Sequence, residues 1–163
     1  MKVLLVRHGA AADGEFPELL RPLTLEGRKS VKRLARSISR SGIRVDAIVS
    51  SPLTRAVQTA EILLAKLSRS HPVRHVSCLV ELAGDFIPGR FSEATFLGWL
   101  AECGRSNVVI VGHEPTLLAL AFWIDPALER SDEIRGIAKS SALLFSCSPG
   151  YDGRFEGHIF PKD

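Results

Sequence analysis

The chain has 163 residues, of which 45% are hydrophobic and 24% charged, and its formal net charge at pH 7 is +3. These values are ordinary for a soluble globular protein, and the length fits one domain over 1–163 that has no large cap insertion. No run is long enough for a signal peptide or a membrane span. The three cysteines form no Cys-x-x-Cys pair, which argues against a disulfide framework or a zinc site. We therefore expect a cytoplasmic protein.

Short aliphatic runs alternate with helix-like segments along the chain, which predicts α/β layering. The first run has no polar alternation, which indicates a strand covered on both faces. The last two runs are close together with no long helix between them, which predicts an antiparallel pair. In chain order, strands are predicted at Val3–Val6, Ala47–Ser50, Val73–Cys78, Val108–Val111, Ala142–Cys147 and Arg154–Phe160.

Helix signals occupy the gaps between most of these strands. Thr24 is a predicted N-cap, and Gly42 marks the predicted end of the first helix. Ser51 and Pro52 supply the predicted N-cap and first helical position of the second helix. In chain order, helices are predicted from Thr24 to about Arg40, from Ser51 to about Ser68, from about Ser92 to Glu102 and from about Thr116 to Trp123.

The charge is unevenly distributed along the chain. Residues 1–80 carry 14 Lys/Arg against 6 Asp/Glu, a balance of +8, whereas residues 81–163 carry 7 against 12, a balance of −5. Much of the basic excess recurs every four residues on the first predicted helix, at Arg28, Lys32, Arg36 and Arg40. This stripe predicts either a solvated helix face or a surface that attracts an acidic protein or polyanion. Nucleic acid is not expected, because no aromatic side chains interleave with the charges.

Four cationic or imidazole side chains follow predicted strands. Arg7 and His8 follow the first strand, Arg55 lies in the first turn of the second helix, and His113 follows the fourth strand. Each has an ordinary structural explanation when taken alone, such as an arginine lying along a helix surface. Ligands collect at the carboxyl ends of strands in open α/β sheets, where such junctions meet at one edge. We therefore expect the four side chains to converge.

Two arginines and two histidines in one place suit a dianionic phosphoryl group. Arginine donates bidentately to phosphate oxygens, and helix N-termini add backbone N–H donors. One histidine can attack phosphorus while the other stabilises the developing charge. A metal site is disfavoured, because the histidines are flanked by arginines and no carboxylate cluster has ligand spacing.

Four sequence blocks resemble the histidine phosphatase superfamily in order and spacing. They are VRHGAA, RPLTLEG, SSPLTRAVQTAE and VVIVGHEPTLLAL. The resemblance implies that His8 is the nucleophile and forms a phosphohistidine intermediate, and that Arg7, Arg55 and His113 complete the phosphate pocket. It implies a three-layer α/β/α sandwich with a mostly parallel central sheet, to which our own analysis adds one antiparallel strand near the C-terminus. No metal or organic cofactor is expected.

Within the superfamily, the chain most resembles the SixA-type phosphohistidine phosphatases, because CLVELAGDF follows the third predicted strand and little room is left for a lid. This implies a phosphorylated protein as substrate and partner, in phosphotransfer or phosphocarrier signalling, with no membrane partner. A small-molecule phosphomonoesterase with the same mechanism is the alternative. A third alternative is a non-catalytic module that binds phosphoproteins.

The sequence leaves the proton donor open. Glu81 stands where many members of the superfamily place theirs, but a solvated loop carboxylate is equally consistent with its position. Asp85 is a second candidate four residues further on. A departing imidazole can already be protonated near pH 7, because its unperturbed pKa is about 6.5. Hydrolysis of phosphohistidine is therefore expected to depend less on a donor than hydrolysis of a phosphoester.

Overall fold

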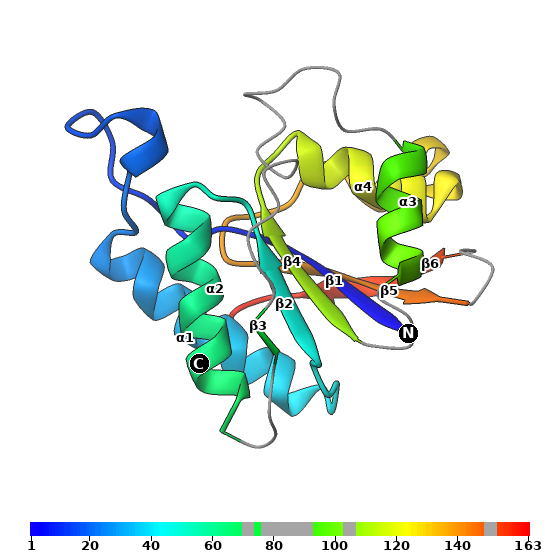
Figure 1. Cartoon of the computed structure of the whole chain (residues 1–163), viewed down its shortest axis with the longest axis horizontal. Coiled ribbons are helices and arrows are strands. Elements are labelled where there is room, and N and C mark those ends of the chain that lie inside the picture. Colours follow the sequence, from blue (N-terminus) through cyan, green and yellow to red (C-terminus); the bar gives the residue numbers. More distant parts are fainter. Residues whose placement is uncertain (70–73, 76–92, 103–106, 149–152) are drawn as a thin grey trace.

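A computed structural model describes residues 1–69, 74–75, 93–102, 107–148 and 153–163 (Figure 1). In this part of the chain one six-stranded sheet has the order β3-β2-β4-β1-β5-β6. The first four strands in that order are parallel, whereas β5 runs antiparallel to both of its neighbours. This confirms the predicted mostly parallel sheet with an antiparallel strand near the C-terminus. The strands are β1 (Lys2–Arg7), β2 (Ala47–Ser50), β3 (Arg74–His75), β4 (Val108–Gly112), β5 (Ala142–Cys147) and β6 (Gly153–Ile159).

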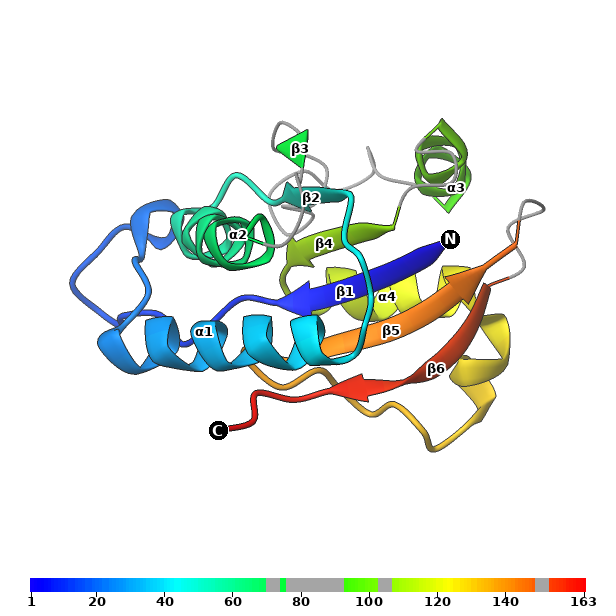
Figure 2. The same ribbon diagram turned by 90° about the horizontal axis from the view of Figure 1, so that it is seen from below.

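Helices cover both faces of the sheet, as Figures 1 and 2 show from two directions. Alternate residues of β1 divide between two apolar cores. Leu4 and Val6 pack with the helices of one layer, and Val3 and Leu5 pack with those of the other. The predicted three-layer sandwich is therefore confirmed. The first layer contains α1 (Leu25–Arg40) and α2 (Thr54–Leu67), and the second contains α3 (Glu93–Glu102) and α4 (Thr116–Ile124).

The caps of α1 are those the sequence predicts. The Thr24 side chain accepts a hydrogen bond from the backbone N–H of Gly27 at 3.0 Å. The chain leaves the helix through Gly42, whose φ of +75° is the left-handed conformation that glycine adopts without strain. The N-terminus of α1 lies so close to the first loop that a Cβ on Gly27 would stand 2.1 Å from the carbonyl oxygen of Ala10. Helix α1 is thus fixed against the chain just after β1.

Helix α2 begins two residues later than predicted. Its N-cap is Leu53, which makes no side-chain capping bond. The predicted cap, Ser51, accepts a hydrogen bond from the Leu53 N–H at 3.3 Å and also bonds the ring of His113 at 2.8 Å. The Ser51 hydroxyl, which the sequence assigns to the cap of α2, therefore also bonds the residue that follows β4. Of the predicted strand Val73–Cys78, only 74–75 lies within the described residues.

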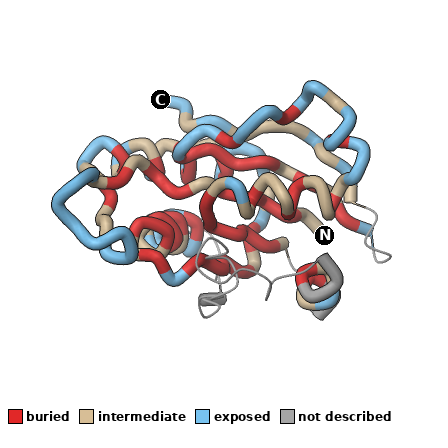
Figure 3. The backbone as a smooth tube through the Cα atoms, turned by 90° about the horizontal axis from the view of Figure 1, so that it is seen from above, coloured by how far each residue is buried: buried red, intermediate tan, exposed pale blue. Residues whose placement is uncertain are grey.

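Two short 3₁₀ helices, η1 (Glu18–Leu20) and η3 (Pro126–Arg130), were not predicted from the sequence. Every residue from 13 to 20 is exposed, so the segment leading into η1 stands away from the core (Figure 3). Within the described ranges, no helix is both long enough and apolar enough to span a membrane.

Candidate active site

The four predicted site residues come from three adjacent strands at one edge of the sheet. β1 ends at Arg7 and is followed by His8, and β4 is followed by His113. Arg55 lies in the first turn of α2, which follows β2. The parallel pairing of β1 with β4 and of β4 with β2 brings these ends into register. The imidazole centroids of His8 and His113 are 4.9 Å apart.

The loop after β1 selects one tautomer of His8. Its Nδ1 lies 2.7 Å from the carbonyl oxygen of Gly9. A carbonyl can only accept, so Nδ1 carries the proton and Nε2 keeps its lone pair. The N–H of Gly9 is in turn held by the Thr59 hydroxyl at 3.2 Å. His8 therefore has the form that a nitrogen nucleophile requires.

Ser51 selects the tautomer of His113 in the same way. Its Oγ is 2.8 Å from Nε2 of His113 and accepts a hydrogen bond from the N–H of Leu53. Among the described residues, Nε2 is the acceptor available to the proton of the buried Ser51 hydroxyl, so that proton is directed to Nε2 and the imidazole proton of His113 is placed on Nδ1. His113 thus presents Nδ1–H as a donor.

Burial and nearby cations keep both imidazoles neutral. The pKa of His8 is lowered to about 4 and that of His113 to about 3, and burial is the largest cause for each. The guanidinium groups of Arg55 and Arg7 contribute to both shifts and His8 contributes to that of His113, whereas the bond to the Gly9 carbonyl acts in the raising direction on His8. At pH 7 the candidate site therefore holds two neutral histidines beside two cations.

A carboxylate and a backbone carbonyl orient Arg7. Its Nη1 lies 2.6 Å from Oε2 of Glu114 and donates to the carbonyl oxygen of Ile137 at 2.7 Å. The other oxygen of Glu114 accepts from the N–H of Ile137. Glu114 therefore ties Arg7, the last residue of β1, to the loop before β5, a function that its place beside His113 in the sequence does not indicate.

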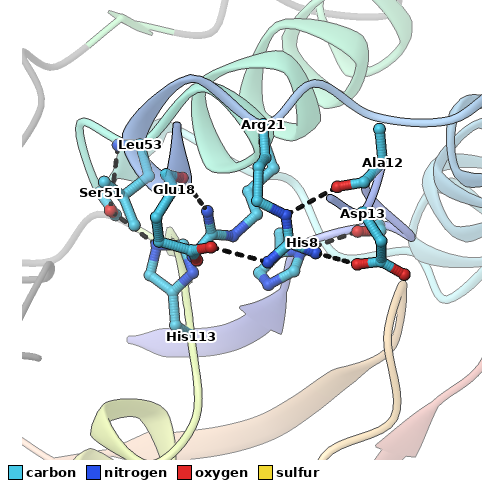
Figure 4. Close-up of polar contacts among 10 residues, drawn as sticks. His8, Ala12, Asp13, Glu18, Arg21, Ser51, Leu53 and His113 are labelled. Atoms are coloured by element: carbon cyan, nitrogen blue, oxygen red, sulfur yellow. Dashed lines mark hydrogen bonds and ion pairs between the residues drawn. The ribbon is translucent and has the colours of Figure 1, made fainter. Parts of the chain in front are cut away.

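The side chain of Arg55 is buried and bonded to η1. Its Nη2 is 2.8 Å from Oε1 of Glu18, and its Nη1 donates to the Glu18 carbonyl oxygen at 2.9 Å. Oε2 of Glu18 pairs with Arg21 at 2.8 Å (Figure 4). The hydrogen bond from Arg21, assisted by Arg55, lowers the pKa of Glu18. Glu18 is thus a carboxylate that contacts the same guanidinium a phosphate oxygen would contact.

Two buried side-chain nitrogens in the described part of the chain have no hydrogen-bond partner, Nε of Arg7 and Nδ1 of His113. An unsatisfied buried polar group costs about 1–3 kcal/mol. Both atoms are N–H donors, and both belong to the candidate site. Two unused donors beside a neutral imidazole fit an anionic ligand with several acceptor oxygens.

Sequence reasoning located the four central side chains but missed Ser51, Glu18 and Glu114 as their polar partners. The proton-donor candidates Glu81 and Asp85 lie outside the described residues. Among the described residues, no three His, Cys, Asp or Glu side chains are grouped so as to hold a metal ion.

Folding stability is expected to depend on these histidines. Their pKa values in the folded state, about 4 and 3, lie below the ordinary 6.5, so between pH 6.5 and 4 the unfolded chain binds more protons. Their contribution is fully present above pH 6.5, and the free energy of unfolding falls as the pH falls through that window. Urea midpoints measured from pH 7 to 5 should decline in the wild type and decline less in a His8→Asn/His113→Asn variant. Equal slopes in the two proteins would contradict this assignment.

Two neutral histidines and two arginines gathered at the carboxyl edge of an α/β sheet define a class of sites suited to a phosphoryl group. The model of the histidine phosphatase superfamily (branch 1) matches residues 3–96, and the chain belongs to this superfamily. An uncharacterized protein from Picosynechococcus sp. is 36% identical over 122 residues, which are 72% of this chain and 68% of that protein.

Two solved structures illustrate the shared fold. The protein histidine phosphatase SixA complexed with tungstate is similar with a TM-score of 0.82 and 24% identity, over 99% of this chain and 97% of that chain. The alpha-ribazole phosphatase from Shigella flexneri is similar with a TM-score of 0.68 and 16% identity, over 99% and 96%. At these identities the likeness establishes the architecture of the chain.

Proposed function

We propose that this protein is a phosphatase that works through a covalent phosphohistidine intermediate on His8. The observation that carries the proposal is the pair of buried, unpartnered donors, Arg7 Nε–H and His113 Nδ1–H, beside the neutral imidazole of His8. A tetrahedral phosphoryl group supplies the acceptor oxygens that both donors lack. Membership of the histidine phosphatase superfamily supports the same conclusion.

In the first step, the Nε2 lone pair of His8 attacks phosphorus, and the bond from phosphorus to the leaving group breaks. The leaving group departs with the bonding electron pair and takes up a proton. The N–H groups of Arg7, Arg55 and His113 stabilise the charge on the equatorial oxygens. In the second step, water attacks phosphorus, the P–N bond breaks with its electron pair returning to Nε2, and the proton lost by water replaces the one given to the leaving group.

We propose a phosphohistidine side chain on a protein as the substrate. The likeness to a protein histidine phosphatase supports this choice. A small phosphomonoester is the alternative substrate, favoured by the likeness to an alpha-ribazole phosphatase. A binding module without catalysis is disfavoured, because His8 is neutral and its Nε2 is unprotonated.

A matched pair of substrates tests the proposed function. Initial rates of phosphate release are measured on a phosphohistidine-bearing phosphotransfer domain and on p-nitrophenyl phosphate. A kcat/KM at least 100-fold higher on the phosphorylated domain is the expected result. A higher kcat/KM on the ester would instead indicate a small-molecule phosphatase. Tight binding of the phosphorylated domain with no release of phosphate from either substrate would favour the third alternative, a binding module without catalysis.

The Glu81→Gln variant is expected to lose more activity on the ester than on phosphohistidine. An alkoxide leaving group needs a proton donor more than an imidazole that can already be protonated near pH 7. The ester for this test is therefore an alkyl phosphate such as glycerol 2-phosphate, because p-nitrophenolate departs without being protonated. We expect a loss on the order of 100-fold for the alkyl phosphate, within the range of general acid catalysis, and a loss of less than about tenfold for phosphohistidine. Asp85→Asn tests the second candidate, and it should keep its activity on the ester if Glu81 is the donor. Equal losses on the two substrates would refute the leaving-group argument.

A further inference from the structure

Four large apolar side chains are exposed within a ten-residue stretch of the chain. Their exposed fractions are 44% for Phe16, 53% for Leu19, 59% for Leu20 and 71% for Leu25, and we call this group the apolar rim. In the rest of the described chain, only Phe160 is comparable. A cluster of exposed apolar residues is more informative than single ones, because clusters mark contact surfaces.

The apolar rim is attached to the candidate site at two points. The first is η1, which carries Leu19 and Leu20 and is bonded to Arg55 through Glu18. The second is the start of α1 at Leu25. There the Thr24 N–H donates to the carbonyl oxygen of Ala10 at 2.9 Å, two residues after His8. In Figures 1 and 2, η1 and the N-terminus of α1 lie at the same end of the molecule. The segments that carry the rim are therefore held beside the candidate site.

A basic face continues from the apolar rim along α1. Lys29, Lys32 and Arg36 are exposed and follow Leu25 at intervals of four, seven and eleven residues, which places them on one side of the helix. None of these three forms an ion pair with the described residues. The stripe predicted from the sequence is thus shifted at its start, because Arg28 is half-buried and Lys29 takes its place. We call these three residues the basic face.

Nearby carboxylates do not neutralise the basic face, because their charges are already matched. Glu26 pairs with Arg33 at 2.7 Å, Glu18 pairs with Arg21 and Arg55, and Asp13 also pairs with Arg21. Glu15 is exposed in the segment beside the apolar rim. The surface thus has an apolar part with carboxylates next to the pocket and an unpaired cationic part beyond it.

We propose that the apolar rim and the basic face together dock an acidic phosphoprotein and deliver its phosphohistidine to the pocket. This inference rests on the proposed function. Apolar contacts at Leu19, Leu20 and Leu25 hold the partner beside the pocket, while the basic face attracts its carboxylates. A protein is favoured over a membrane as the partner, because the rim is bonded through Glu18 to Arg55 of the site whose proposed substrate is a phosphorylated protein side chain.

The test separates docking from chemistry by presenting the same P–N bond with and without a protein surface. One substrate is an acidic phosphotransfer domain phosphorylated on histidine, and the other is the free amino acid phosphohistidine. The docking variants are Leu20→Ser and Lys29→Glu/Lys32→Glu. The matched control is Lys66→Glu/Arg69→Glu, which reverses two exposed charges at the far end of α2.

Both docking variants are expected to raise the KM for the phosphorylated domain about tenfold with little change in kcat. On free phosphohistidine their rates should equal those of the wild type, and the control should match the wild type on both substrates. Added salt should raise the wild-type KM for the domain and have less effect on the charge variant.

Several results would overturn the proposal. Unchanged rates on the phosphorylated domain in both docking variants would contradict the docking proposal without contradicting the proposed function. Equal losses of rate on the domain and on free phosphohistidine would indicate that these residues act in catalysis and not in docking. If the wild type released phosphate from neither substrate, the proposed function would fail and the docking proposal with it. If the wild type sedimented as a dimer and Leu20→Ser dissociated it, the surface would be assigned to contact with a second copy of the chain. If the wild type pelleted with phosphatidylserine vesicles and both variants abolished the pelleting, the surface would be assigned to a membrane.

Discussion

Turnover of both phosphohistidine and phosphomonoester substrates is expected to fall by about 10⁴-fold or more in the His8→Ala variant, the scale of loss when a covalent nucleophile is removed. Nε2 of His8 is the nitrogen whose lone pair is kept available, since Nδ1–H is committed to the Gly9 carbonyl. The other imidazole cannot substitute for it, because the proton on Nδ1 and the bond from Ser51 to Nε2 occupy both nitrogens of His113. The measurement is steady-state phosphate release together with trapping of a ³²P-labelled enzyme.

The trapped intermediate identifies the nucleophile independently of the rate. Label on wild-type enzyme should survive alkali and be lost in acid, as a phosphoramidate bond requires, and His8→Ala should carry none. His113→Ala is the companion variant, and it should still become labelled, more slowly, because it lacks only a donor to the phosphoryl oxygens. An alanine variant at His8 that retains label, or a rate within 100-fold of the wild type, would place the nucleophile elsewhere.

The sequence predicts most of the sheet because the signals that specify it are local. Val3–Val6 is apolar without alternation, and the structure buries those residues on both faces of β1. Thr24 and Gly42 carry the side chain and the backbone freedom that the two ends of α1 require. The placing of Arg7, Arg55 and His113 at one edge followed from parallel strand topology alone.

The partners of the site residues could not be predicted, because they depend on contacts between distant segments. Glu18 bonds Arg55 across 37 positions of the chain, and Ser51 bonds His113 across 62. Periodicity indicates which face of an element is apolar but not which polar group meets another at the end of a strand. For Ser51 the local rule missed one of two partners, because its hydroxyl accepts from the N–H of Leu53, two residues on, and also bonds the buried ring of His113.

Replacing Arg55 with alanine is expected to lower kcat/KM by about 10²–10³-fold, the range found when one preorganised donor to a developing charge is removed. The side chain is 8% exposed, so its charge acts in a poorly solvated site. Its guanidinium also lowers the pKa values of His8 and His113. The loss of activity at low pH, set in the wild type by protonation of His8 at a pKa of about 4, should therefore move to higher pH in Arg55→Ala. The pH dependence of kcat/KM measures both effects.

A purely structural role for Arg55, as the anchor of η1, predicts a different set of results. In that case Glu18→Ala would reproduce the loss, because it removes the carboxylate at the other end of the same ion pair. We expect Glu18→Ala instead to keep kcat/KM within about fivefold of the wild type, and tungstate to bind it at least as tightly, because a competing anion has left Arg55. Arg55→Lys should fall between the wild type and alanine, since lysine keeps the charge but not the two-pronged geometry that phosphate oxygens accept. If Glu18→Ala and Arg55→Ala lost activity equally, with the acid limb unmoved in both, Arg55 would be a structural residue and the phosphate would have to be held by Arg7 and His113 alone.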